Sequence, residues 1–200
     1  MKLAELAKRL NSDNAAGLGL PPLLLITDAQ RLPDPAGAAA RLPRGSAVIL
    51  RDYDMAEREA LARQLADVAR RCGLKLLIAG DAQLAIRIGA AGIHLPEARA
   101  GEARRWRHRS HWLITVAAHS REALHHGAMC GADAALLSPV YETPSHPHRR
   151  PLGPEGFNLL AAHAPLPVYA LGGINRHNAA RLLTGRAAGI AAIGAFAGSY

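Results

Sequence analysis

The sequence predicts an α/β fold, a single (β/α)8 TIM barrel, from three observations. Short apolar runs recur along the chain without period-2 alternation, which is typical of strands buried on both faces. Helical patterns stand between these runs. The last two runs, 167–175 and 189–195, contain glycine where a helix should begin, at Gly172, Gly173 and Gly194. Loops after strands seven and eight of such barrels commonly bind phosphate through backbone N–H groups and a helix N-terminus.

Composition supports one globular domain over residues 1–200. The chain is 50% apolar and 20% charged, which excludes disordered and collagen-like classes. No apolar run reaches the roughly 18 residues that a membrane span needs, and the first residues contain no apolar signal core. We therefore expect a cytoplasmic protein with no membrane partner. Cys72 and Cys130 lie far apart without CxxC spacing, so neither a zinc site nor a disulfide framework is indicated.

The net charge of +8 raises the question of nucleic-acid binding. The basic residues are scattered over several predicted helices, and aromatic residues make up only 4% of the chain, so there is no predicted stacking platform. We therefore predict no nucleic-acid partner. The positive charge would also favour small anionic substrates.

Eight strands can be assigned in order. The predicted strands are 23–28, 47–51, 74–79, 92–95, 113–117, 134–138 and the two runs named above. The predicted helices are 1–10, 36–41, 55–72, 82–88, 103–108, 120–130, 156–163 and 175–183. Glycine after 55–72 and serine at 120 are the expected helix stop and helix N-cap. Only six residues follow Gly194, so the eighth helix is missing or reduced to 196–200, and the extra N-terminal helix could cover that gap.

Polar residues at the carboxyl ends of barrel strands face the functional site in this fold. The residues at or just past these ends are Asp28, Arg51, Asp81, His94, His119, Ser138, Glu142, Thr143, Gly172, Gly173 and Gly194.

Several segments resemble the thiamine phosphate synthase/TenI superfamily. They are Leu-Ile-Thr-Asp at 25–28, Gly-Ala-Ala-Gly-Ile-His-Leu-Pro at 89–96, Val-Ala-Ala-His-Ser at 116–120, Ser-Pro-Val-Tyr-Glu-Thr at 138–143 and Ala-Leu-Gly-Gly-Ile at 170–174. The resemblance covers almost the whole chain from residue 23. It implies a TIM barrel that takes a phosphorylated thiazole as its small-molecule partner.

The synthase branch of this family joins a pyrimidine diphosphate to a thiazole phosphate, with Mg²⁺ between two carboxylates. This sequence departs from that pattern. Arg51 is retained, but Ile49 and Tyr53 replace the family's glutamine and lysine, and Arg99 stands at the second metal aspartate. Ala117 and His146 replace a serine and a lysine. We predict no metal, and Mg²⁺ only if the chain is a synthase; Asp81 is either a surviving ligand or a helix N-cap.

The TenI branch shares the barrel and the phosphate site, and its characterised members isomerise a thiazole by moving a proton. The resemblance at 116–120 and 140–143 identifies His119 and Glu142 as catalytic candidates. Histidine suits this role because its ordinary pKa lies near neutral pH. Arg51, Thr143 and the three glycines are then the candidate substrate-binding and phosphate-binding residues. His119 and His94 could each instead be structural.

Three functions remain open from the sequence. The first is a TenI-like thiazole tautomerase, the second a thiamine phosphate synthase, and the third a non-catalytic protein that binds a phosphorylated metabolite. The state of assembly is also open, with a homodimer as one option.

Overall fold

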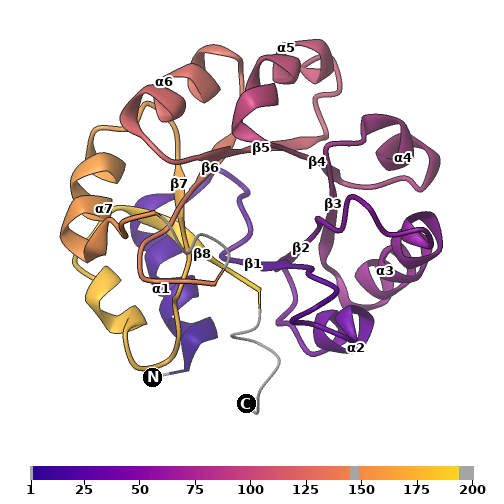
Figure 1. The fold of residues 1–200 in the computed structure, drawn as a ribbon, viewed down its shortest axis with the longest axis horizontal. Helices are drawn as coiled ribbons and strands as arrows, with labels where there is room; N and C mark the ends of the chain where they lie inside the picture. The colour runs from indigo at the N-terminus through magenta and orange to yellow at the C-terminus, as the bar shows by residue number, and fades with distance from the viewer. Residues whose placement is uncertain (1, 145–148, 194–200) are drawn as a thin grey trace.

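The computed structural model describes residues 2–144 and 149–193. Eight parallel strands pair in sequence order, and β8 pairs with β1 to close the barrel (Figure 1). The predicted fold class is therefore confirmed. The segment 194–200, which includes Gly194 and the position of the reduced last helix, lies outside the described residues.

Each strand is short and buried along most of its length. The strands are β1 (Leu23–Ile26), β2 (Ala47–Leu50), β3 (Lys75–Ala79), β4 (Gly92–Leu95), β5 (Leu113–Ala118), β6 (Ala134–Leu137), β7 (Val168–Leu171) and β8 (Ala187–Ala192). The α-helices are α1 (Leu3–Asn14), α2 (Pro35–Ala40), α3 (Arg58–Cys72), α4 (Ala82–Arg87), α5 (Ala103–Trp106), α6 (Arg121–Met129) and α7 (Gly153–Ala162). Two 3₁₀ helices, η1 (Glu97–Glu102) and η2 (Ala179–Leu182), complete the described elements.

Alternation along the strands divides the buried residues into two clusters. Outward residues such as Leu25, Val48 and Ile78 pack against the surrounding helices. Inward residues such as Ile26, Ile49 and Ala79 fill the barrel. Because successive side chains of a strand point to opposite faces, this alternation also determines which residues beyond each strand point inward.

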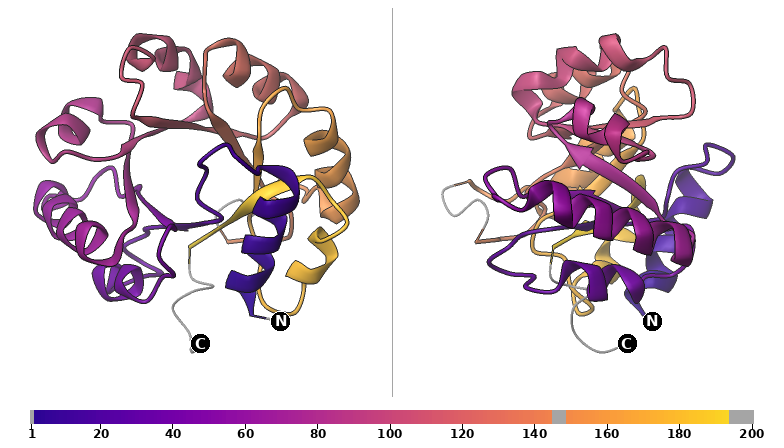
Figure 2. Two further views of the ribbon diagram at one scale, coloured as in Figure 1. Left: turned by 180° about the vertical axis from the view of Figure 1, so that it is seen from behind. Right: turned by 90° about the vertical axis from the view of Figure 1, so that its right-hand side faces the viewer.

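The N-terminal helix packs beside β8, as Figures 1 and 2 show. Asn11 donates through its side chain to the carbonyl of Ala188 at 2.9 Å, and Asn14 donates to that of Ala187 at 3.1 Å. Leu20, after this helix, packs among the inward residues. The extra N-terminal helix is thus confirmed. The chain around Leu20 fills the amino-terminal end of the barrel, and the candidate residues lie at the opposite, carboxyl end.

Two helix ends lie where residue type predicts them. Gly73 ends α3 in the left-handed conformation at φ +66°, and Ser120 caps α6 by accepting a hydrogen bond from the Ala123 N–H at 3.1 Å. Both were predicted from residue type. The glycine is favoured at the end of α3 because a side chain would be strained at that φ.

The helix predicted over 175–183 is wrong. The structure has only a four-residue 3₁₀ helix there, η2. The Asn175 side chain accepts from the N–H of His177 at 2.9 Å, and the Asn178 side chain accepts from the N–H of Asn175 at 2.9 Å. Asparagine side chains that bond to nearby N–H groups compete with helix formation, which explains the shorter element.

Other helix boundaries also differ. The helix predicted over 156–163 begins at Gly153, and the helix predicted over 1–10 runs over Leu3–Asn14. The helix predicted over 103–108 is preceded by η1 and ends at Trp106, and the helix predicted from residue 55 begins at Arg58. Among the described residues, none of the helices has the length and apolar character needed to cross a membrane.

Candidate active site at the carboxyl end of the barrel

Five candidate side chains share the inward phase of their strands. Residue 28 continues the inward series of 24 and 26, and residue 51 continues that of 47 and 49. On the same reasoning the inward set at the carboxyl end is Asp28, Arg51, His94, His119 and Ser138, whereas Gly80, at φ +67°, interrupts the alternation after β3. The fold therefore gathers around the barrel mouth residues that come from five different strands.

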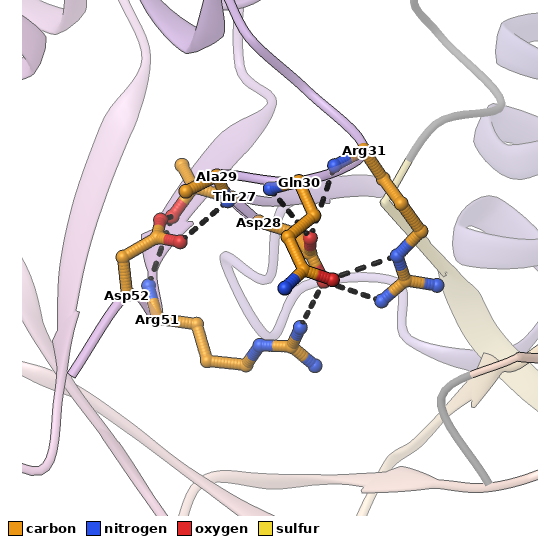
Figure 3. A network of polar contacts seen from close by, with 7 residues as sticks. All are labelled: Thr27, Asp28, Ala29, Gln30, Arg31, Arg51 and Asp52. Atoms are coloured by element: carbon orange, nitrogen blue, oxygen red, sulfur yellow. Dashed lines mark hydrogen bonds and ion pairs between the residues drawn. The ribbon is translucent and has the colours of Figure 1, made fainter. Parts of the chain in front are cut away.

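Asp28 links two arginines at this mouth (Figure 3). Its Oδ2 accepts from Nη2 of Arg31 at 2.5 Å and from Nη2 of Arg51 at 2.6 Å. The hydrogen bond from Arg31 is the largest cause that holds the pKa of Asp28 below its usual range, and the Arg51 charge adds to it. Asp28 therefore fixes the position of Arg51 and stays ionised while doing so.

A second carboxylate braces the same loop. Asp52 accepts from the Thr27 hydroxyl at 2.5 Å and from the Ala29 N–H at 2.6 Å, and the Thr27 hydroxyl accepts from the Arg51 N–H at 3.0 Å. Figure 3 shows these contacts beside the Asp28 cluster. The backbone on both sides of Arg51 is thus held in place. Arg31, Thr27 and Asp52 were not identified from the sequence as site residues.

His94 is nearly enclosed within the barrel. Its side chain lies opposite Thr115 on the neighbouring strand, with Nδ1 3.0 Å from the Thr115 hydroxyl oxygen. Burial lowers the pKa of His94 to about 4, with a smaller contribution from the charge of Arg51. His94 is therefore neutral at neutral pH.

This burial predicts a specific pH dependence of stability. An unfolded histidine has a pKa of about 6.5, so between about pH 6.5 and pH 4 the unfolded chain binds a proton that folded His94 does not. The free energy of unfolding should fall over this range by up to about 3 kcal/mol because of His94 alone. Urea unfolding at pH 7.0 and 4.5 should show this loss in the parent protein and a smaller loss in His94→Gln. Equal losses in the two proteins would contradict the prediction.

His119 has a carboxylate partner. It directly follows the last residue of β5, and its Nδ1 lies 2.6 Å from Oε2 of Glu97 in η1. The His119 side chain is 16% exposed and that of Glu97 is 40% exposed. When Nδ1–H donates to the carboxylate, this contact orients the imidazole ring. Glu97 was missed because it lies 22 positions away in a segment without a helix pattern.

Gly172 and Gly173 turn the chain directly after β7. Their φ angles are +101° and +64°. A Cβ on Gly173 would lie 2.4 Å from the carbonyl oxygen of Glu142, and one on Gly172 would lie 2.9 Å from Cα of Pro139. Within residues 2–144 and 149–193, the N–H groups of these two glycines donate no hydrogen bond. The loop after β6 therefore packs closely against this turn, and the two N–H groups of the turn are donors that could bind an anion.

Hydrogen bonds from Asn178 and Tyr141 hold the loop after β7 in place. The Asn178 side chain donates to the carbonyl of Gly173 at 2.8 Å, and the Tyr141 hydroxyl donates to the carbonyl of Asn178 at 3.1 Å. The Tyr141 N–H donates to the carbonyl of Gly172 at 3.0 Å. Tyr141, next to the candidate Glu142, thus joins the loops after β6 and β7.

Asp81 caps a helix. Its Oδ1 accepts from the Leu84 N–H at 2.8 Å, and its Oδ2 lies 3.7 Å from Nη1 of Arg58. The N-cap alternative predicted for Asp81 is therefore confirmed. Arg58, which the sequence did not identify, also donates to the Ala79 carbonyl at 2.5 Å and lies over the Tyr53 ring, 5.6 Å from its centroid.

Arg99 lies next to Asp81, where it contacts the preceding residue, Gly80. Its Nη1 donates to the Gly80 carbonyl at 2.9 Å, and its other two nitrogens bond to the Glu102 carboxylate at 2.6 and 2.9 Å. In the described part of the chain, no group of three or more His, Cys, Asp or Glu side chains is arranged to hold a metal ion. The carbonyl oxygens of Ala79 and Gly80, at the end of β3, thus accept hydrogen bonds from guanidinium groups.

The other predicted site residues have less defined surroundings. Ser138 is buried at the end of β6, Glu142 is exposed, and Thr143 is half-buried with an interaction of its own. Gly194 lies outside the described residues. The structure thus brings Arg51 next to Asp28 and His119 next to Glu97, and it packs the backbone of Glu142 against Gly173.

Comparisons with known proteins agree with this barrel. The profile of the thiamine monophosphate synthase family (TMP-TENI) matches residues 23–196. The chain is 34% identical over 185 residues to the thiamine-phosphate synthase of Chlorobium luteolum, with 88% of this chain and 84% of that protein aligned. It is 30% identical to the thiamine-phosphate synthase of Chloroflexus aurantiacus, over 67% of this chain and 62% of that protein.

A solved structure shares the fold. The thiamine phosphate pyrophosphorylase of Pyrococcus furiosus superposes with a TM-score of 0.73 and 24% identity, over 86% of this chain and 84% of that one. The likeness confirms the barrel architecture. With the family profile covering most of the chain, these findings show that the protein belongs to the thiamine monophosphate synthase (TMP-TENI) family of thiamine biosynthesis.

Proposed function

We propose that this chain is a TenI-like thiazole tautomerase in which His119 moves the proton. The observation that carries the proposal is the 2.6 Å contact between His119 Nδ1 and the Glu97 carboxylate at the end of β5. A histidine oriented by a carboxylate is a common arrangement for general acid–base catalysis. It is placed among the inward residues of the barrel mouth, where barrel enzymes carry out their chemistry.

The isomerisation shifts a proton between a carbon and an exocyclic position of the thiazole. His119 Nε2 takes the proton from one position, and the same atom returns it to the other, so no external acid or base is consumed. Glu97 keeps the ring in one orientation during both transfers. Glu142 is the second candidate for this role, because its backbone lies against Gly173 beside the proposed phosphate site.

The phosphate of the substrate would be held at the end of β7, two strands along the barrel from β5. The N–H groups of Gly172 and Gly173 supply donors, and Arg51 supplies a positive charge that Asp28 holds in position. Thr143 would add a side-chain hydroxyl from the loop after β6. In this arrangement His119 acts on the thiazole ring, and the glycine N–H groups and Arg51 bind the phosphate.

The synthase is the second candidate, and the names of the relatives and the retained Arg51 favour it. The residues at the family's metal positions do not fit Mg²⁺. Mg²⁺ requires several oxygen ligands in octahedral geometry, whereas Asp81 caps α4 next to Arg58, and Arg99 stands where a carboxylate is needed. A non-catalytic protein that binds a phosphorylated metabolite is the third candidate, and the absence of turnover would favour it.

One assay separates these functions. Protein treated with a chelator should isomerise thiazole carboxylate phosphate at the same rate before and after Mg²⁺ is added. With pyrimidine diphosphate and thiazole phosphate it should release no pyrophosphate above the rate of a no-enzyme control. Isomerisation is followed by NMR of the thiazole ring, and pyrophosphate by a coupled assay. Mg²⁺-dependent pyrophosphate release would instead establish the synthase.

A further inference from the structure

The proton positions of the His94–Thr115 pair follow from burial. Thr115 is fully buried, so its hydroxyl proton needs an acceptor inside the protein. In the described part of the chain, the contact of the Thr115 hydroxyl is with His94 Nδ1, at 3.0 Å. The hydroxyl therefore donates to Nδ1, and the proton of the neutral ring is on Nε2.

The second ring nitrogen of His94, Nε2, belongs to a side chain that is almost enclosed. The His94 residue is only 7% exposed. Within residues 2–144 and 149–193, Nε2 has no hydrogen-bond partner. The buried side-chain atoms without a partner there are Ser46 Oγ, Arg58 Nε, Arg109 Nε and Asn158 Oδ1. Because Nε2 is not among these buried atoms, it retains accessible surface.

His94 has small residues next to it in the sheet. In the sheet His94 lies between Ala79 on β3 and Thr115 on β5, and residue 117, two positions further along β5, is also alanine. Arg51 lies close enough for its charge to act on His94, so an anionic substituent has a positive partner nearby.

We infer that the Nε2–H of His94 donates a hydrogen bond to a ring nitrogen of the bound heterocycle, and that Thr115 makes this possible by holding the tautomer. His94 is then a specificity-determining residue that recognises a neutral aromatic nitrogen, while Arg51 and the glycines bind the anion. The inference rests on the proposed function, since it takes a phosphorylated azole as the ligand.

A pair of ligands tests this contact. Thiazole phosphate carries the ring nitrogen, and the corresponding thiophene phosphate replaces that nitrogen with C–H at nearly the same shape. The parent protein should bind thiazole phosphate about 3- to 10-fold more tightly by calorimetry, the difference that one net hydrogen bond gives. His94→Phe should bind the two ligands equally. The matched change His163→Phe, at an exposed histidine after α7, should keep the parental preference.

A second variant addresses the tautomer. Thr115→Val removes the hydroxyl that holds Nδ1 as the acceptor, so the ring can place its proton on Nδ1 and the preference should shrink. Long-range ¹H–¹⁵N spectra of His94 should show the Nε2–H form in the parent and a mixture in Thr115→Val. This variant decides the matter if His94→Phe does not fold.

The outcomes distinguish the two proposals. Tight but equal binding of both ligands by the parent protein would overturn the role of His94 and leave the proposed function standing. Failure to bind either ligand, or inorganic phosphate, would overturn the proposed function and this inference with it. An Nδ1–H tautomer in the parent protein would overturn the inference by itself.

Discussion

The substitution His119→Asn should lower the isomerisation of thiazole carboxylate phosphate by ~10²–10⁴-fold, the range for loss of a general acid–base group. Asparagine keeps a polar side chain of similar reach at the end of β5, so the barrel should fold. The phosphate donors at Gly172 and Gly173 are on another strand end and do not change. The rate and the phosphate affinity should therefore separate, which single-turnover rates and calorimetric titration with inorganic phosphate would measure.

Two further variants make this result specific. Glu97→Gln keeps a hydrogen-bonding group beside His119 Nδ1 but removes the carboxylate charge, so it should reduce the rate by less than His119→Asn does. His125→Asn, at an exposed position of α6, should be fully active. Equal losses of rate and phosphate affinity in His119→Asn would indicate a structural histidine. Parental turnover in that variant would transfer the acid–base assignment to Glu142.

The barrel was predictable because its signals are local. Each buried parallel strand is a short apolar run, and helix ends such as Gly73 and Ser120 are specified by residue type within one turn. Residues at the strand ends could then be assigned to one site from the topology alone. This is why the sequence alone predicts that Arg51, His94 and His119 belong to the site.

Partners distant in sequence were not predictable in the same way. Glu97 reaches His119 across 22 positions and Asp28 joins Arg51 across 23, and neither pairing has a periodic signal. The helix predicted over 175–183 was wrong because of local contacts and not distant ones. Its apolar spacing is helical, but Asn175 and Asn178 use their side chains to bond the local backbone. Chemical pairings therefore needed the structure, while the fold did not.

The second large effect, on stability and phosphate binding, is expected from a substitution at Gly173 in the turn after β7. Comparison with Gly89 separates the cost of backbone strain from the cost of a steric conflict. Gly173 and Gly89 both have φ +64°, but a Cβ on Gly89 meets nothing within 4 Å, whereas one on Gly173 lies 2.4 Å from the Glu142 carbonyl oxygen. Both substitutions to alanine should therefore carry the same backbone strain, about 1–2 kcal/mol of unfolding free energy. Only Gly173→Ala adds the steric conflict.

Gly173→Ala should therefore destabilise the protein by about 1–3 kcal/mol more than Gly89→Ala does, since overpacking a tight contact costs that much. It should also weaken phosphate binding by ~10–100-fold, because relief of the contact with the Glu142 carbonyl displaces the turn that carries the two N–H donors, and a hydrogen bond to a charged group contributes about 1.5–3 kcal/mol. Urea unfolding and calorimetric titration with inorganic phosphate measure the two effects. Gly89→Ala, on the far side of α4, should bind phosphate as the parent does. Parental phosphate affinity in a folded Gly173→Ala protein would show that the anion is held elsewhere.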